Sequence, residues 1–532
     1  MADTLPLSWK IRRYLWDSMF ILIYKGKKVL PIPVPVPTSP PLRVIRMSER
    51  EPTIAIPNIM VADRIPGDER SVKMLLAYAL RRFLYKVYPA NQPGLPGIDP
   101  DIEVALKQAF NDRYQALYPV PLRAAELWAD GGQVDLGAMA LNSPYACFLQ
   151  RDGDRLVWDF TDLKDHSLHR DLISPACTVV FEPDPAKPGQ VRAVEIDCVL
   201  GRVRPGDPDW PRARALAMCG ASTQVSLVRH FNWVHLACGA HFAVATRNRL
   251  SPDHVICRLV WPHMYGTQNS NYLVTAGQML PNGEFESIFS FTHDGMCKLF
   301  ARTHYNYRIS VIDPELDWEE RGLAGSGLVS PVQQNLLGLH RVMHDHATAY
   351  IAAYYPDDAA LRAEGQVINW LADMDRTIPN GIQRISGPIT PEALTRAGLA
   401  RLIAGLTYMA AVQHEALGSV MWNYQLWVDQ NPVRVYKDGR RLPVDIYQRL
   451  LNANFNLNVR RAKLLQDFEY MGVDDKGKTL FRAFHDRLQA LEDSYTARYQ
   501  PERLADPDEP HDREKFPPWI ILPSAIDANI NA

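Results

Sequence analysis

The chain has 532 residues, of which 47% are hydrophobic and 22% are charged, so it is a globular chain long enough for a large core. Its formal net charge of −2, with no strongly basic stretch, argues against a nucleic-acid-binding protein. The seven cysteines contain no CxxC pair and are odd in number, which favours reduced thiols in a cytoplasmic protein over a disulfide framework.

The N-terminal segment predicts an arm rather than a membrane span. Its apolar run, MFILIY, is six residues long, whereas a span needs about 20, and no small-residue cleavage site follows it. The arm is predicted to be an amphipathic helix packed on the protein's own body. Peripheral membrane contact is the alternative, because aromatic residues lie among lysines and arginines there. The alternating prolines of VLPIPVPVPTSPP predict an extended connector along the surface, so residues 1–45 are expected to form arm and connector, and residues 46–532 the main body.

Helical periodicity dominates the main body. Apolar residues recur at helical spacing in two segments, 71–88 and 102–117. The same periodicity returns in five later stretches, which are 210–246, 336–355, 364–374, 389–427 and 479–499. Between residues 145 and 205, short β-branched and aromatic runs bounded by Asp, Gly and Pro predict a small sheet. The predicted fold class is therefore mainly α, with a minor β element.

The most informative stretch is RHFNWVH, which contains His230 and His235. Residues five apart on an α-helix diverge by about 140°, so two histidines at this spacing cannot bind one ion. They converge only where the helix loosens into a π-type turn, a distortion found mostly at functional sites. A third histidine, His414, lies in an apolar run, where a buried imidazole needs a partner. Three imidazoles and an oxygen donor would describe a non-haem metal site, whereas each pattern alone also fits ordinary buried histidines.

Other histidines fit structural roles. The run LGLHRVMHDH places His340, His344 and His346 at i, i+4 and i+6, which splits them across two helix faces. This spacing predicts a solvated helix side rather than a second metal site. His241 is interpreted as a packed or supporting residue.

The order of the motifs resembles that of the lipoxygenase family. HFNWVH, followed by a run ending in LVWPH, is similar to that family's two iron histidines and downstream Leu-x-x-Pro-His pattern. Further similar blocks keep the family order over residues 135–532, namely LNSPYACFLQR, WPRARALAMCGAST, DPELDWEERGLAG, YIAAYYPDDAALRAEGQVINWLADM and FRAFHDRLQALEDSYTARYQPERL. The resemblance implies a large helical catalytic domain, with no N-terminal β-sandwich lipid-binding domain in residues 1–134. It also places His254 and His263 at structural positions.

The resemblance implies a metal site with four protein ligands. Carried over to this chain, the iron ligands are His230, His235, His414 and the terminal carboxylate of Ala532. The family usually ends in isoleucine, but a main-chain carboxylate survives the change to alanine. Iron, as Fe2+ or Fe3+, is the implied cofactor, with manganese as the alternative.

Three positions around the ligands depart from the family pattern. The family often has an asparagine four residues after the third histidine, where this chain has Gly418. Restoring it with Gly418→Asn is expected to add a weak ligand. Of two glutamines that often flank the ligands, one is replaced by Met421, and Gln224 lies two residues before the position of the other. These changes imply three imidazoles, one carboxylate and water around the ion, with an altered hydrogen-bond network.

The implied activity is a dioxygenase that acts on a small apolar substrate and O2. Iron in this family takes a hydrogen atom from a carbon between two double bonds, and the carbon radical traps O2 to give a hydroperoxide. Candidate pocket-lining residues are Phe231, Val234, Leu417 and Val420, each of which also fits a plain core position. Two alternatives stay open: a divergent oxidase acting on a specialised metabolite, and a non-catalytic lipid-binding protein with the same fold. The expected location is cytoplasmic, with peripheral membrane association through the arm as the alternative.

Overall fold

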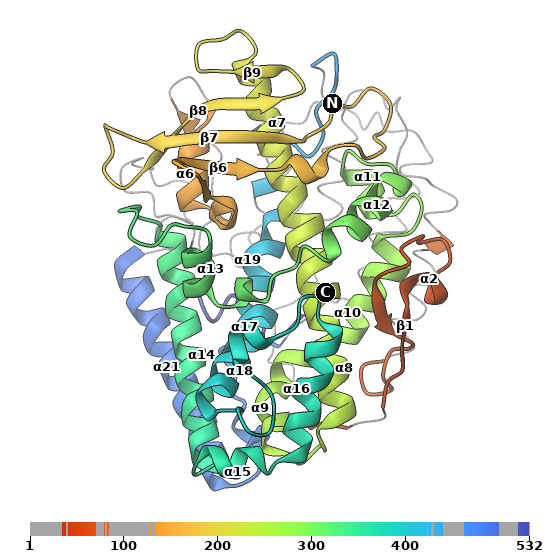
Figure 1. The fold of residues 1–532 in the computed structure, drawn as a ribbon, viewed down its shortest axis with the longest axis vertical. Helices are drawn as coiled ribbons and strands as arrows, with labels where there is room; N and C mark the ends of the chain where they lie inside the picture. Colours follow the sequence, from red (N-terminus) through yellow and green to blue (C-terminus); the bar gives the residue numbers. More distant parts are fainter. Residues whose placement is uncertain are drawn as a thin grey trace, which may run out of the picture.

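The computed structural model describes residues 34–38, 41–70, 79, 82–83, 128–129, 133–422, 424–426, 430–439, 462–499 and 520–530. Figure 1 shows a tall helical body with an antiparallel sheet lying across one end. The expected N-terminal arm helix lies outside the described residues, and so do almost all of the two helices expected in 71–88 and 102–117. In the described part of the chain, no helix combines the length and the apolarity that crossing a membrane requires.

Helices make up most of the described chain, as the periodicity predicted. The α-helices are α2 (Met47–Arg50), α6 (Leu136–Asn142), α7 (Trp210–Thr223), α8 (Ala240–Arg249), α9 (Val255–Met264), α10 (Thr267–Leu273), α11 (Glu284–Ile288), α12 (His293–His304), α13 (Pro314–Glu320), α14 (Pro331–Tyr354), α15 (Asp358–Arg362), α16 (Gly365–Thr377), α17 (Gln383–Ser386), α18 (Arg396–Tyr408), α19 (His414–Gly418) and α21 (Asp475–Tyr499). Three π-helical segments are η4 (Gln224–Gly239), η5 (Val274–Gln278) and η7 (Met409–Gln413). Short 3-10 turns are η2 (Pro144–Phe148), η3 (Thr161–Leu163), η6 (Ile309–Ile312), η8 (Ser419–Trp422), η9 (Tyr424–Leu426) and η10 (Glu469–Met471).

The sheet forms where the short apolar runs predicted it. Its five antiparallel strands follow chain order, namely β5 (Gln150–Asp152), β6 (Arg155–Asp159), β7 (Cys177–Pro183), β8 (Val191–Cys198) and β9 (Gly201–Val203). Trp158, Val179, Ile196 and Val203 pair in register across four strands, and all four are buried. Because side chains alternate along a strand, this row gives the sheet one apolar face. That face contributes to the same core as the helices, and α7 packs against β7 and β8. Two short antiparallel pairs also occur in the described part of the chain, β1 (Val44–Arg46) with β2 (Met60–Ala62) and β3 (Trp128–Ala129) with β4 (Gln133–Val134).

The end of the proline-rich connector packs on the helical body. Residues 34–38 form no helix or strand, and Val34 is buried in the main core. The carbonyl oxygen of Pro35 accepts a hydrogen bond from the Trp261 indole on α9. The described piece of the connector is therefore held by packing and hydrogen bonds.

Helix α14 is more deeply buried than its sequence suggested. It packs between α18 and α21 (Figure 1). His340 meets the Tyr408 ring edge-on, and His346 stacks on the Phe484 ring with centroids 4.4 Å apart. The prediction of a solvated histidine face is wrong for these two residues, because neighbouring helices cover both sides. The expected split across two faces is confirmed.

Candidate metal centre

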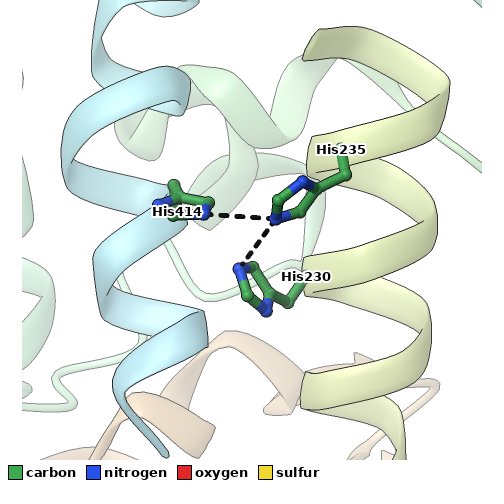
Figure 2. A group of neighbouring side chains, drawn as sticks. All are labelled: His230, His235 and His414. Carbon is green, nitrogen blue, oxygen red and sulfur yellow. Dashed lines mark hydrogen bonds between the residues drawn. The ribbon is translucent and has the colours of Figure 1, made fainter. Parts of the chain in front are cut away.

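Three imidazoles converge between η4, which carries His230 and His235, and α19, which begins at His414 (Figure 2). The His235 Nε2 atom lies 3.3 Å from His230 Nε2 and 3.2 Å from His414 Nε2. All three side chains are buried, at 3%, 0% and 2% exposure for His230, His235 and His414. Among the described residues, they form the only group of three His, Cys, Asp or Glu side chains close enough to hold an ion. The structure thus brings together the three histidines that the sequence singled out.

A π-helix produces this convergence. The segments α7, η4 and α8 follow one another in one continuous helical rod, and both histidines lie in its π-helical middle. Because π-helical hydrogen bonds run from i to i+5, residues five apart come to the same face. Asn232 and Trp233, between the two histidines, point away from the imidazoles and bond to the Thr303 hydroxyl and carbonyl of α12. The loosened turn predicted from the HxxxxH spacing is confirmed.

Asn271, which sequence reasoning missed, fixes the protonation of His235. Its amide nitrogen donates to the backbone oxygen of His235 at 3.1 Å, so its Oδ1 atom faces His235 Nδ1, also at 3.1 Å. An amide oxygen can only accept, so Nδ1 carries the proton and Nε2 presents its lone pair to the other two imidazoles. Asn271 is the last residue of the polar run QNSN and lies eight residues after His263. Nothing in that run indicates a contact with His235.

The triad fits a metal ion on geometric and chemical grounds. An ion about 2.1 Å from two nitrogens, at an angle of about 90° to 109°, separates them by about 3.0 to 3.4 Å. Both measured Nε2 separations lie in this range. The group contains no carboxylate or thiolate from the described residues, and an all-imidazole set suits iron, copper or zinc in particular. The arrangement could therefore hold a metal ion.

Comparison with known proteins agrees with this centre and this fold. Residues 185–445, which include all three histidines, match the lipoxygenase family. The manganese lipoxygenase of Pleurotus sapidus is 28% identical over 276 residues, which are 48% of this chain and 41% of that protein. The hydroperoxide isomerase ALOXE3 of Homo sapiens is 23% identical over 208 residues, or 38% of this chain and 28% of that protein. The structure of coral 8R-lipoxygenase superposes with a TM-score of 0.68 and 14% identity, covering 99% of this chain and 82% of that one.

The chain is a distant member of the lipoxygenase family. The sequence matches span less than half the length of either relative. The match to coral 8R-lipoxygenase shows the fold, a mainly helical lipoxygenase-like architecture with a small antiparallel sheet.

Gly418 faces the triad, one helical turn after His414. A Cβ added there would lie 2.9 Å from both Cε1 and Nε2 of His230. The His230 ring thus occupies the space that any side chain at residue 418 would need. An asparagine at this position would have to displace the His230 imidazole before it could add a ligand, so the expected effect of Gly418→Asn stays a prediction.

Gln224 and Met421, the residues at or next to the two departed glutamine positions, are both buried. Gln224 is buried at the start of η4, and its amide donates to the Asp162 carboxylate of η3, away from the histidines. Met421 is buried in η8. Instead, Gln425 donates to the Ser222 carbonyl and to the Ser226 hydroxyl at 2.8 Å. This buried amide links η9 to the rod that carries His230 and His235, and no local pattern in the sequence predicts the contact.

The C-terminal tail is anchored close to the π-helix. His263 Nδ1 bonds to the carbonyl oxygen of Ala528 at 2.8 Å, and Asp527 pairs with Lys463. Ile526 and Ile530 are both fully buried. A Cβ added to Gly239, the last residue of η4, would overlap the Ile530 side chain.

Ala532 itself lies outside the described residues, so its role as a ligand stays a prediction. Ile530 is two residues from the chain end and packs against Gly239, four residues after His235. Burial of Ile526 and Ile530 anchors this part of the tail.

The candidate pocket-lining residues fall into two groups. Leu417 lines a small cavity of about 50 Å³, together with Cys147, Val311, Tyr408, Gln413 and Ala416. Val420 is fully buried nearby, and Val234 is buried on η4. Phe231 packs against the His230 and Phe285 rings, at centroid distances of 4.5 and 4.3 Å. Leu417 therefore contacts a cavity, which is smaller than the several hundred Å³ of a typical ligand site.

Burial keeps the supporting histidines neutral. It lowers the pKa of His241 to about 4 and that of His304 to about 3. Burial also lowers the pKa of His263 to about 4, against a smaller opposing effect of its bond to Ala528. His254 caps α9 by accepting a hydrogen bond from Ile256 N. His254 and His263, which were expected to be structural, therefore each make a defined hydrogen bond, with Ile256 and Ala528 respectively.

Proposed function

We propose that this protein is a non-haem metal dioxygenase of the lipoxygenase type. It removes hydrogen from an unsaturated, fatty-acid-like substrate and adds O2 to give a hydroperoxide. The observation that carries the proposal is the convergence of three buried imidazole nitrogens, two from a π-helix and one from a facing helix. Family membership supports it, since the matched segment contains the whole triad.

The proposed ligands are His230, His235, His414 and the terminal carboxylate of Ala532. Iron, cycling between Fe2+ and Fe3+, is the proposed ion, and manganese is the alternative because one relative is named a manganese lipoxygenase. When bound, such an ion supplies the one-electron oxidising chemistry needed to remove a hydrogen atom from a carbon between two double bonds.

The chain's own residues contribute position and exclusion of water. Asn271 holds the Nδ1 proton of His235, which keeps the Nε2 lone pair directed at the ion. Burial of the three imidazoles in an apolar core removes competing water. We propose that Phe231, Val234, Leu417 and Val420 line the path of the apolar substrate, holding one carbon against the centre.

A second candidate function is a lipoxygenase-fold oxidase or isomerase that converts a specialised metabolite without releasing a hydroperoxide. Gly418 favours it, because this position offers no side-chain donor and so alters the coordination. One relative is named a hydroperoxide isomerase.

The test is metal analysis of the purified protein together with O2 uptake and product analysis over a panel of polyunsaturated fatty acids. His230→Ala, His235→Ala and His414→Ala are each expected to lower metal affinity by at least about 100-fold, more than loss of a supporting contact does, and to abolish O2 uptake. His346→Phe, a buried histidine outside the triad, serves as the matched control and should retain both. Metal-loaded protein that neither consumes O2 nor converts hydroperoxides would refute the proposal in favour of a binding protein. Conversion of hydroperoxides without O2 uptake would favour the second candidate.

A further inference from the structure

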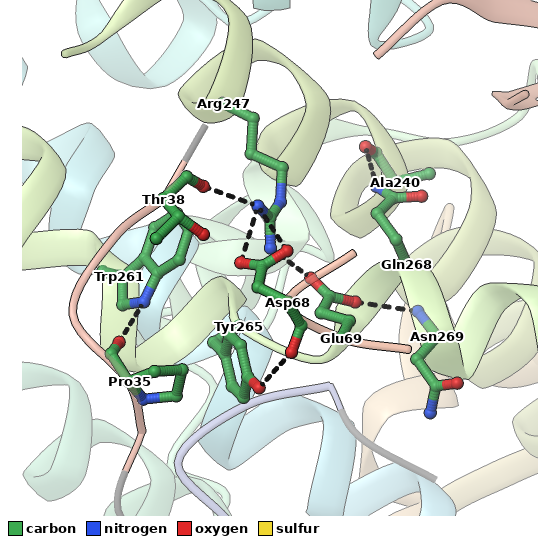
Figure 3. A network of polar contacts seen from close by, with 10 residues as sticks. All are labelled: Pro35, Thr38, Asp68, Glu69, Ala240, Arg247, Trp261, Tyr265, Gln268 and Asn269. Carbon is green, nitrogen blue, oxygen red and sulfur yellow. Dashed lines mark hydrogen bonds and ion pairs between the residues drawn. The ribbon is translucent and has the colours of Figure 1, made fainter. Parts of the chain in front are cut away.

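A buried ionic cluster joins α8 to the N-terminal part of the chain (Figure 3). The Arg247 side chain has no exposed surface, and its guanidinium donates to Glu69 Oε1 at 2.6 Å and to Asp68 Oδ2 at 3.0 Å. The same group lies over the Trp261 ring, 4.7 Å from its centroid, and donates to the carbonyl oxygen of Thr38. Because an unpaired buried charge is very unfavourable, these contacts fix the position of Glu69.

The second oxygen of Glu69 reaches the helix that supports the metal centre. Its Oε2 atom accepts a hydrogen bond from the backbone N–H of Asn269 at 2.9 Å (Figure 3). Asn269 lies in the first turn of α10, which begins after Gly266, whose φ of 88° lies in the left-handed region. Two residues further along the same helix, Asn271 bonds to His235.

These contacts form a closed loop of interactions that passes through His235. His235 and Arg247 lie on one continuous helical rod, formed by η4 and α8. Arg247 holds Glu69, Glu69 holds the first turn of α10, and α10 returns to His235 through Asn271. The amide of Gln268 adds a second tie, since it donates to the carbonyl of Ala240 at 3.1 Å (Figure 3). This loop of contacts fixes α10 against the rod. A shift of Glu69 would therefore move Asn271 relative to the Nδ1 atom of His235.

We propose that Glu69, held by Arg247, is a positioning residue of the metal centre: it sets α10 so that Asn271 keeps His235 in the tautomer that directs Nε2 at the ion. The proposal rests on the proposed function only in taking His235 as a metal ligand. Glu69 bonds to Arg247 on the rod and to Asn269 on α10, and to no residue of the triad, so its effect on His235 passes through these two elements.

The test measures the tautomer of His235 and the affinity for Zn2+, a redox-inert ion that binds imidazole tightly. The tautomer is read by nitrogen-15 NMR of histidine-labelled, metal-free protein, and the affinity by competition with a chromophoric chelator. Asn271→Ala is expected to weaken Zn2+ binding about 10- to 100-fold and to reduce the Nδ1–H population of His235. Asn271→Asp keeps an acceptor for that proton and should restore the tautomer.

The role of the Glu69–Arg247 ion pair is tested by the double variant Glu69→Met with Arg247→Met. This variant removes both charges, so neither member of the pair is left buried without the other. It should reproduce the Asn271→Ala effects in the same direction. Arg247→Lys keeps the charge but loses the planar fork, so it is a milder variant for the case in which the double variant does not fold. Arg249→Met is the matched control, because Arg249 lies on the same helix and pairs with Asp373 of α16 rather than with α10; it should change neither reading.

The outcomes separate this proposal from the proposed function. If the variants of the Glu69–Arg247 ion pair fold and keep the His235 tautomer and the Zn2+ affinity of the unaltered protein, the positioning role is refuted. The proposed metal centre is not affected by that result. Failure of the unaltered protein to bind Zn2+ more tightly than its His414→Ala variant would overturn the proposed metal site. The tautomer measurement would then still decide whether Glu69 controls His235.

Discussion

Gly418→Ala offers the sharpest test of how closely the triad is packed. The added methyl group would lie 2.9 Å from Cε1 and Nε2 of His230, whereas carbon atoms in favourable contact lie about 3.5 to 4.0 Å apart. To remove this overlap, the His230 ring or the helix that carries residue 418 must shift by roughly 0.6 to 1.1 Å.

The ring has little room for such a shift. Its centroid lies 4.5 Å from that of Phe231, 4.9 Å from that of His235 and 4.8 Å from that of His414. Metal–ligand distances hold to within about 0.2 Å in well-formed sites, so the required movement exceeds what a ligand can absorb. We expect Gly418→Ala to lower metal affinity by at least about 10-fold, comparable to loss of a supporting contact.

The assay is metal occupancy after dialysis at a fixed free-ion concentration, together with the electron-spin-resonance spectrum of the loaded protein. Gly418→Asn should behave at least as severely, because asparagine carries the same Cβ atom and more volume. Full occupancy and an unchanged spectrum in Gly418→Ala would refute the packing argument. Full occupancy with a changed spectrum in Gly418→Asn alone would restore the idea of an added ligand.

Three further predictions concern the tail and the core. Gly239→Ala should push Ile530 out of its position and reduce metal occupancy, whereas Ala532→Ile should change metal occupancy little. Equal metal occupancy in the two variants would contradict the role given to the tail. Deleting Ala532 moves the terminal carboxylate by about 3.5 Å, so this deletion or an appended C-terminal tag should impair metal binding, and unimpaired tagged protein would exclude the carboxylate as a ligand. Burial lowers the pKa of His346 to about 3, so the stability it contributes as a neutral group is present above about pH 6.5 and is lost as pH falls towards 3. His346→Phe should therefore flatten the fall in unfolding free energy between pH 6 and 4, by up to about 1.4 kcal/mol per pH unit, and chemical denaturation showing the same slope in both proteins would contradict it.

Local pattern predicted the parts of this structure that local chemistry determines. The short runs of residues 145–205 became the sheet because their alternation places Trp158, Val179 and Ile196 on one face. The five-residue spacing of His230 and His235 predicted a π-helix because no other helix brings them together. In contrast, the burial of His346 depends on Phe484, far along the chain.

The residues that form hydrogen bonds around the metal centre could not be predicted from local sequence patterns. Asn271 meets His235 across 36 residues, and Glu69 meets Arg247 across 178. Neither pair has a spacing that a periodic pattern could reveal, because the contact exists only after the helices have packed. Gly418 was visible as a departure from the family, yet the sign of its effect depended on where the His230 ring lies.

The π-helical distortions themselves point to the centre. In the described part of the chain, every π-helical segment borders it: η4 contains His230 and His235, η5 begins three residues after Asn271, and η7 ends at the residue before His414. A π-turn weakens helix packing and is normally confined to a single turn, so 16 consecutive residues of it in η4 need compensation. The structure supplies it through side chains that tie the rod to its neighbours, such as Asn232 to the carbonyl of Phe300 and Gln425 to Ser226. Distortion that is concentrated at three imidazoles and supported from several elements is the pattern expected where convergence of the ligands, rather than stability of the helix, constrains the chain.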